Sequence, residues 1–143
     1  MNAAAKQVFL LLIGLQVLHA TEEYYFQLWD KLAPARFISG LFSSNLAHGF
    51  ILANILVVLL GLWCYLFPLR RGSTYAGLIV WLWILLEFAN GVAHIVLAIG
   101  SWSYFPGLMT APLLLLTSSY LAALSAVSLG NTETAQQAGE RSL

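Results

Sequence analysis

Four long apolar stretches set the fold that this chain can adopt. They cover residues 7–29, 41–67, 75–99 and 112–129, and each is long enough to cross a bilayer, which takes roughly 20 residues as a helix. Only 8% of the 143 residues are charged, whereas a soluble domain carries about 25%. Because the connections are short, we expect an all-α integral membrane protein, a four-helix bundle that runs up-down-up-down.

The remaining composition narrows the function classes. Six Lys and Arg stand against six Asp and Glu, which leaves no basic face for nucleic acid. Cys64 is the only cysteine, so a disulfide framework or a cysteine-based metal cluster is excluded. We expect one transmembrane domain over residues 1–130 and a disordered polar tail over residues 131–143. Residues 101–111 are rich in aromatic side chains and predict an interfacial loop.

The basic residues give an orientation. The apolar run near the N-terminus continues through Tyr24 and Tyr25 to Trp29, which favours an uncleaved span over a signal peptide. Four basic residues would lie on one side and two on the other, so both termini are predicted to be cytoplasmic, in a plasma (inner) membrane. The first group is Lys6, Arg70, Arg71 and Arg141, and the second is Lys31 and Arg36.

Three of the apolar stretches contain polar residues that lipid does not favour. An ionisable side chain at mid-helix costs about 2.5–3.5 kcal/mol on insertion scales, and such residues usually mark a functional site. The set includes all three histidines of the chain and three of its six acids. In chain order its members are His19, Glu22, Glu23, Asn45, His48, Glu87, Asn90 and His94.

Helix geometry predicts that these side chains meet. At 100° per residue, the ionisable residues of the first stretch fall within an arc of about 100°, and Glu87, Asn90 and His94 fall within about 60°. The histidines lie near the end of the first stretch, the start of the second and the end of the third. In an antiparallel bundle these ends share one side of the membrane, so we expect one common site.

The motifs resemble those of a known family. His19-Ala20-Thr21-Glu22-Glu23 is an H-x-x-E-E motif, His48 follows on the second stretch, and Asn90 and His94 form an N-x-x-x-H motif. The chain resembles the HXXEE-domain family of small polytopic membrane proteins over its first three stretches. The resemblance implies that these motif residues form the site, and it implies no particular reaction. Glu87 lies outside the family pattern and rests on helix geometry alone.

Ligands at positions i and i+4 of a helix can bind one metal ion, as in zinc motifs of the H-x-x-E-H type. By analogy, His19 and Glu23 are predicted ligands, with His48 and His94 completing the set and Glu22 acting as general base. Asn90 would orient a ligand or a substrate carbonyl, and Glu87 would support the ligands or carry a proton. Three or four such ligands plus water form a catalytic zinc site, in which the pKa of the water falls to about 7.

The sequence thus predicts a membrane-embedded enzyme with a divalent metal, zinc ahead of iron, that hydrolyses a lipid-soluble or lipid-linked substrate. The bilayer and this substrate are its expected partners, and a homo-oligomer stays open. Three alternatives remain. A metal-free site could isomerise or cyclise a lipid or terpenoid by proton transfer. The Glu and His inventory partly matches a di-iron oxidase. A proton-coupled small transporter would use Glu87, the deepest acid.

Overall fold

The computed structural model describes residues 2–140, with side chains for residues 2–127. Every regular element among the described residues is helical. In chain order the elements are α1 (Ala3–Tyr25), α2 (Leu28–Lys31), α3 (Ala33–Phe42), α4 (Leu46–Cys64), the π-helical turn η1 (Tyr65–Leu69), α5 (Ala76–Ser101) and α6 (Ala111–Glu140).

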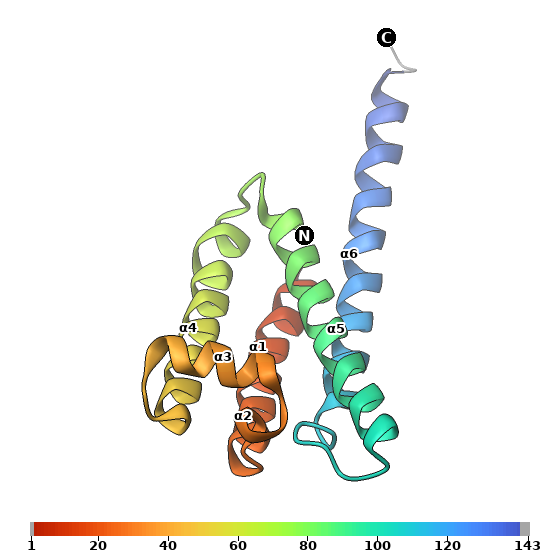
Figure 1. Ribbon diagram of the computed structural model, residues 1–143. Coiled ribbons are helices and arrows are strands. Elements are labelled where there is room, and N and C mark those ends of the chain that lie inside the picture. Colours follow the sequence, from red (N-terminus) through yellow and green to blue (C-terminus); the bar gives the residue numbers. More distant parts are fainter. Residues whose placement is uncertain (1, 141–143) are drawn as a thin grey trace.

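The four long helices α1, α4, α5 and α6 alternate in direction along the chain, so α1 and α5 run the same way (Figure 1). Helix α1 packs against α4 and α6, and α5 packs against α6. Three helices are long and apolar enough to cross a membrane, namely Ala3–Tyr25, Leu46–Leu69 and Ala76–Ser101. The prediction of an all-α fold is therefore confirmed for the described residues, and three of the four predicted spans correspond to helices that are long and apolar enough to cross a membrane. The apolar part of α6, Ala111–Val127, is shorter, and a fourth span stays a prediction.

Two predicted span ends were wrong, and local backbone chemistry explains both. Helix α1 ends at Tyr25 rather than residue 29, because Gln27 adopts a left-handed conformation with φ of 55°. The second long helix begins at Leu46 rather than residue 41. Its cap is Asn45, whose side chain accepts a hydrogen bond from the His48 backbone N–H at 3.2 Å, as residues of this type commonly do at a helix N-terminus.

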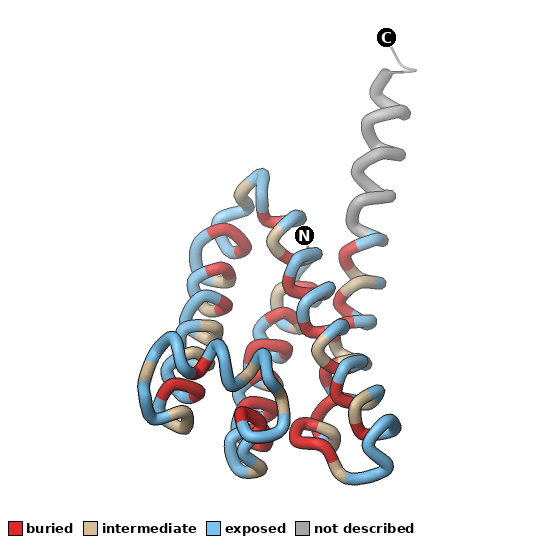
Figure 2. The backbone as a smooth tube through the Cα atoms, viewed as in Figure 1, coloured by how far each residue is buried: buried red, intermediate tan, exposed pale blue. Residues whose placement is uncertain are grey.

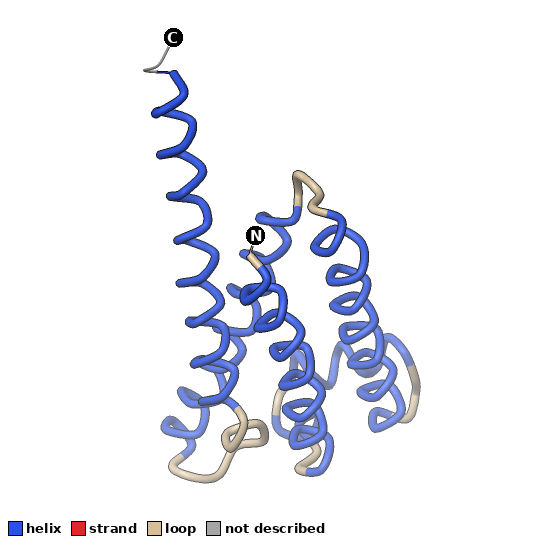
Figure 3. The backbone as a smooth tube through the Cα atoms, turned by 180° about the vertical axis from the view of Figure 1, so that it is seen from behind, coloured by secondary structure: helices blue, strands red, loops and turns tan. Residues whose placement is uncertain are grey.

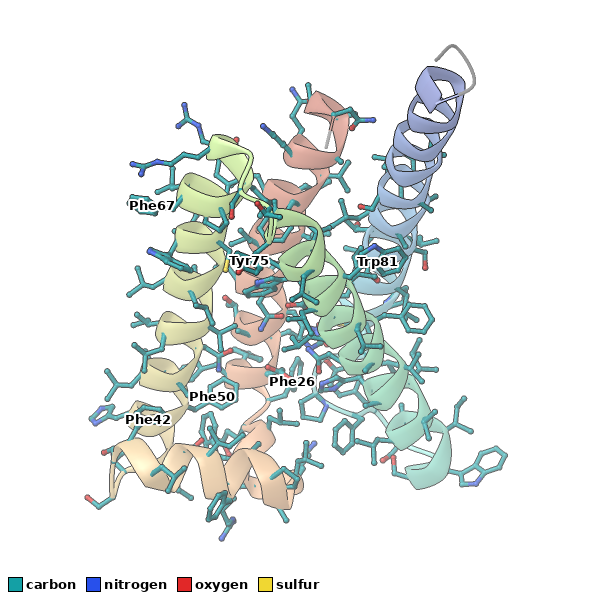
Figure 4. The ribbon with its side chains drawn as sticks, turned by 90° about the horizontal axis from the view of Figure 1, so that it is seen from above. Phe26, Phe42, Phe50, Phe67, Tyr75 and Trp81 are labelled. Carbon is teal, nitrogen blue, oxygen red and sulfur yellow. The ribbon has the colours of Figure 1, made fainter. Side chains whose placement is uncertain are left out.

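Helix α3 was not predicted. It begins with Pro34 in its first turn, where proline costs no hydrogen bond, and it lies across the ends of α1 and α4 (Figure 4). Its buried Ser39 rests on Gly49 of α4, where an added Cβ would lie 1.9 Å from the Ser39 carbonyl oxygen. The absence of a side chain at Gly49 therefore allows α3 to dock tightly on α4.

The loop of residues 102–110 differs from the predicted interfacial loop. It leaves α5 at Trp102, which is 94% exposed, and then curls back beside the bundle (Figure 3). Its second half is largely buried, including Phe105, Gly107 and Thr110 (Figure 2). Its Tyr104 ring packs on Phe26, just beyond the end of α1, with ring centroids 4.6 Å apart. Only the first part of this loop therefore has the exposure expected at an interface.

The larger apolar core lies between α1, α5 and α6, and α4 and η1 add Cys64 and Leu69 to it. Phe9 and Trp83 meet edge to face, with ring centroids 5.9 Å apart, and Leu114 and Leu121 of α6 are fully buried in the same cluster. On α5, an added Cβ at Gly91 would lie 3.0 Å from the Ala111 carbonyl oxygen, so the start of α6 approaches α5 closely. The predicted disordered tail, residues 131–143, lies outside the residues whose side chains the structure describes.

Candidate metal centre

Three predicted ligands converge inside the bundle. His19 and Glu23 lie one turn apart on α1, His94 lies on α5, and all three are buried. Oxygen Oε1 of Glu23 is 3.3 Å from Nε2 of His19 and 3.0 Å from Nε2 of His94. The two imidazole rings are nearly perpendicular, with centroids 4.7 Å apart. One ligand atom from each residue lies within 4.8 Å of the others, which is close enough for one ion to contact all three.

The second nitrogen of His94 fixes the tautomer of this ring. Its Nδ1 lies 2.5 Å from the carbonyl oxygen of Pro106. A carbonyl oxygen can only accept, so Nδ1 carries the proton and donates it. In a neutral imidazole, Nε2 then has a free lone pair, and that lone pair faces Glu23.

The hydrogen bonds of His19 indicate its tautomer in the same way. Its Nδ1 lies 2.7 Å from the Thr110 hydroxyl, which in turn donates to Oε2 of Glu22 at 2.6 Å. Because the hydroxyl proton goes to Glu22, the Thr110 oxygen accepts from Nδ1 of His19. Nε2 of His19 again points a lone pair toward Glu23, and it is buried without a hydrogen-bond partner among the described residues.

Two imidazole lone pairs and a carboxylate oxygen therefore face one another with no donor between them. Such an arrangement requires positive charge, which either a proton on an imidazole or a metal ion can supply. Metal-binding histidines almost always donate their other N–H to a carbonyl, a carboxylate or water. The bond from His94 to Pro106 and the chain from His19 through Thr110 to Glu22 are of this kind.

Glu22 does not face the three ligand atoms. Its Oε1 accepts from the Tyr104 hydroxyl and from the Met109 backbone N–H at 2.9 Å, and its Oε2 accepts from both the N–H and the hydroxyl of Thr110. The two N–H groups immediately precede α6, where a negative charge is favoured. Burial, together with the Glu22 carboxyl, raises the pKa of the Tyr104 phenol above its ordinary value. Glu22 therefore holds the loop and α6 against α1.

Gly107 forms the cover over the imidazoles. It adopts φ of +88°, a conformation that favours glycine. A Cβ at this position would lie 2.6 Å from Nδ1 of His94 and 2.7 Å from Cε1 of His19. The absence of a side chain at Gly107 therefore allows the loop to approach both rings closely.

Glu87 and Gln16 lie deeper in the same seam between α1 and α5. Glu87 is 0% exposed, and both of its carboxyl oxygens, as well as Oε1 of Gln16, are buried without a hydrogen-bond partner among the described residues. Gln16 precedes Glu23 by seven residues, and Glu87 precedes His94 by seven. Because α1 and α5 run in the same direction, this equal spacing places Gln16 and Glu87 at one level, about 10 Å along the helices from Glu23 and His94.

The structure separates His48 from the other predicted ligands. His48 is exposed in the first turn of α4 and does not belong to the group of ligand atoms. Helix α4 turns Phe50 and Asn54 toward α1, across an apolar groove of about 370 Å³, and His48 lies about 160° around the helix from Phe50. Asn90 is half-buried, one turn before His94.

Sequence reasoning missed the residues that the loop contributes. Thr110, Pro106, Gly107 and Tyr104 contact the histidines or Glu22 from more than ten residues away in the sequence. The dipeptide Pro106-Gly107 is typical of a turn, but no periodic pattern relates a loop to the helix that it touches. Tyr104 also lines an open groove of about 510 Å³ together with Ile95, Ala98, Ile99, Trp102 and Leu108.

Comparison with known proteins gives a family but no activity. A family profile described as "Protein of unknown function with HXXEE motif" matches residues 10–122. Neither a search of curated proteins nor a search of solved structures found a match. The match covers most of the chain, so the protein belongs to the HXXEE family, as its motifs indicated.

Proposed function

We propose that this HXXEE protein is a membrane-embedded, zinc-dependent hydrolase that acts on a lipid-soluble or lipid-linked substrate. The observation that carries the proposal is the set of three buried ligand atoms, His19 Nε2, His94 Nε2 and Glu23 Oε1, which face one another. Two histidines and one glutamate are the protein ligands of several zinc hydrolases, which leave a fourth position for water.

A metal ion accounts for more of the geometry than a proton does. A proton on either imidazole would satisfy Glu23 and leave the other Nε2 lone pair without a partner. An ion would satisfy all three ligand atoms at once, while Thr110 and the Pro106 carbonyl hold the rings by their Nδ1 atoms. Zinc would supply a bound water with a pKa near 7 and would polarise the bond to be cleaved.

The roles that we propose for the residues around the ligands differ in part from those that the sequence predicted. Both oxygens of Glu22 accept hydrogen bonds, so we assign it to positioning His19 through Thr110 rather than to general-base catalysis. Asn90 is available to contact a substrate carbonyl. Four spans, with both termini cytoplasmic, remain our proposal for the topology.

Metal content tests the proposal directly. Wild-type protein purified in detergent is expected to bind about one zinc ion per chain, whereas His19→Ala and Glu23→Ala lose it. His48→Ala is the matched control, because this histidine is exposed and outside the group, and it should bind zinc like the wild type. Equal, near-zero zinc content in all four proteins would exclude the metal site and favour the metal-free alternatives.

Hydrolysis is tested separately. Wild-type protein in lipid vesicles should release a product from an ester- or amide-containing lipid, detected by mass spectrometry. The activity should disappear with a chelator and return with zinc. Turnover that persists after chelation would instead support proton-transfer chemistry, and uptake without product would support a transporter.

A further inference from the structure

The end of the molecule beside the candidate metal centre carries exposed apolar side chains that lie outside the three candidate spans. On α3, four large apolar residues are 43–69% exposed, and they fall within an arc of about 140° around the helix. These residues are Phe37, Ile38, Leu41 and Phe42, and we refer to them as the α3 apolar face. At the same end, Tyr25 and Trp102 are 78% and 94% exposed.

Helix α3 cannot turn this face inward. The contact between Ser39 and Gly49 fixes its small-residue side against α4, and Ser39 is 0% exposed. A surface ion pair at 2.8 Å joins Arg36 of α3 to Asp30 of α2, and the Arg36 Nε also donates to the Trp29 carbonyl oxygen. The helix is therefore held crosswise to the spans, with its apolar face outward.

The bilayer is the occupant that fits this surface. An amphipathic helix that lies in the membrane plane buries its apolar side about 5–10 Å into the boundary between headgroups and acyl chains. Exposed tyrosine and tryptophan residues mark the same boundary. Here Tyr25 ends α1 and Trp102 directly follows α5, and these two helices end on the side of the molecule where α3 also lies (Figure 1). The α3 apolar face thus lies at the same end of the molecule as these exposed aromatic side chains.

These markers set the depth of the metal centre. Along α1, His19 lies six residues before Tyr25, and along α5, His94 lies eight residues before Trp102. At 1.5 Å per residue, the two histidines lie about 9–12 Å inward from the interfacial aromatic residues, which is short of the middle of a core about 30 Å thick. The open groove is lined by residues from Ile95 to Trp102 along this interval of α5 and by Tyr104, whose phenol donates to Glu22.

We propose that α3 rests in the headgroup–acyl boundary of one leaflet, and that the substrate is a lipid of that leaflet whose ester or amide bond lies just below its headgroup. The first part follows from the fold, and the second rests on the proposed hydrolase function. Hydrolysis adds the hydroxide of water to the acyl carbon and its remaining proton to the leaving oxygen or nitrogen, so water is the only co-reactant.

The position of α3 can be measured without any activity. A nitroxide label is placed at Phe37→Cys, with Lys31→Cys as the polar control, because Lys31 is exposed in the preceding helix α2. Both variants are made in a Cys64→Ser background and measured in phosphatidylcholine/phosphatidylglycerol vesicles. The label at residue 37 should be accessible to oxygen and protected from a water-soluble nickel chelate, and the label at residue 31 should show the reverse. Leu41→Cys repeats the test where Phe37→Cys does not fold.

Other outcomes overturn this part of the proposal. Equal access of the chelate to both labels would place the α3 apolar face in water. Strong spin–spin broadening at residue 37, with disulfide-linked dimers in the unlabelled protein, would show that a second copy covers the face. Neither result depends on the metal, so each leaves the proposed hydrolase function standing.

The substrate class is tested with three probes. Phosphatidylcholine carries its esters at the boundary, a wax ester carries its bond among the chains, and p-nitrophenyl acetate is soluble in water. We expect phosphatidylcholine hydrolysis to exceed that of the wax ester by about tenfold or more, equivalent to about 1.4 kcal/mol. Preferred cleavage of either other probe would refute the substrate class, whereas no zinc-dependent cleavage of any probe would count against the hydrolase function itself.

Discussion

Gly107 offers the sharpest test of how the candidate site is built. In Gly107→Ala, the new methyl group would start 2.6 Å from Nδ1 of His94 and 2.7 Å from Cε1 of His19, so the rings or the loop must move. The backbone itself adds a cost of about 1–3 kcal/mol, because a residue with a side chain is strained at positive φ. We expect lower stability and, because both rings are displaced, zinc affinity reduced about 10–100-fold.

Alanine variants of two other glycines separate the effect of backbone strain from the effect of displacing the imidazole rings. Gly72 also has positive φ, +68°, but nothing lies within 4 Å of an added Cβ, so Gly72→Ala should lose stability and keep its zinc affinity. Gly14 lies within α1 and is equally unobstructed, so Gly14→Ala should gain roughly 0.5–1 kcal/mol from helix propensity.

Thermal unfolding in detergent micelles and zinc competition against a chelating dye would measure both quantities for the three variants. The interpretation requires that Gly107→Ala differ from Gly72→Ala in zinc affinity. If these two variants bind zinc equally well, the contact between the Gly107 backbone and the imidazoles has no role in holding the ligands.

Three further predictions concern the residues around the ligands. Thr110→Val removes the hydroxyl between His19 and Glu22. It should weaken zinc binding about 10–100-fold in the dye competition and lower the free energy of unfolding by about 1–3 kcal/mol. Ser118→Ala is the control, because the Ser118 hydroxyl bonds only within α6, and it should bind zinc normally. Glu87→Gln should keep both zinc content and thermal stability, because no described residue bonds the Glu87 oxygens, and a loss of zinc would show that Glu87 is a ligand. Because the pKa of the Tyr104 phenol is raised, this phenol keeps its proton near pH 10, where free tyrosines ionise. Ultraviolet titration up to that pH should therefore count the same number of tyrosinates in the wild type and in Tyr104→Phe. One tyrosinate fewer in the variant would contradict the raised pKa.

The spans and part of the site could be predicted because both depend on local patterns. Apolar length alone located α1, α4 and α5, and the i, i+4 spacing placed His19 and Glu23 on one face. Helix ends were less predictable, because they depend on single residues such as the left-handed Gln27 and the capping Asn45. Helix α3 was missed because its ten residues are too few to register as a span.

The error at His48 has a different cause. Depth in the membrane can be read from position along a helix, and by that measure His48 matches the other histidines. Rotation cannot be read in the same way, because α4 is apolar on nearly all sides and no stripe marks the side that faces α1. In α1 and α5, by contrast, the polar residues themselves mark the buried stripe, and their grouping was therefore predictable.

The two adjacent glutamates show why the H-x-x-E-E spacing suits this fold. Consecutive helical residues differ by about 100° in direction, so Glu22 and Glu23 cannot face the same neighbour. Glu23 turns to His94 on α5, while Glu22 turns to the start of α6. Thr110 then connects Glu22 back to His19, so one motif provides two candidate ligands and the support for one of them. This gives α6 a part in the site although it supplies no candidate ligand, since its N-terminal loop holds both imidazoles in place.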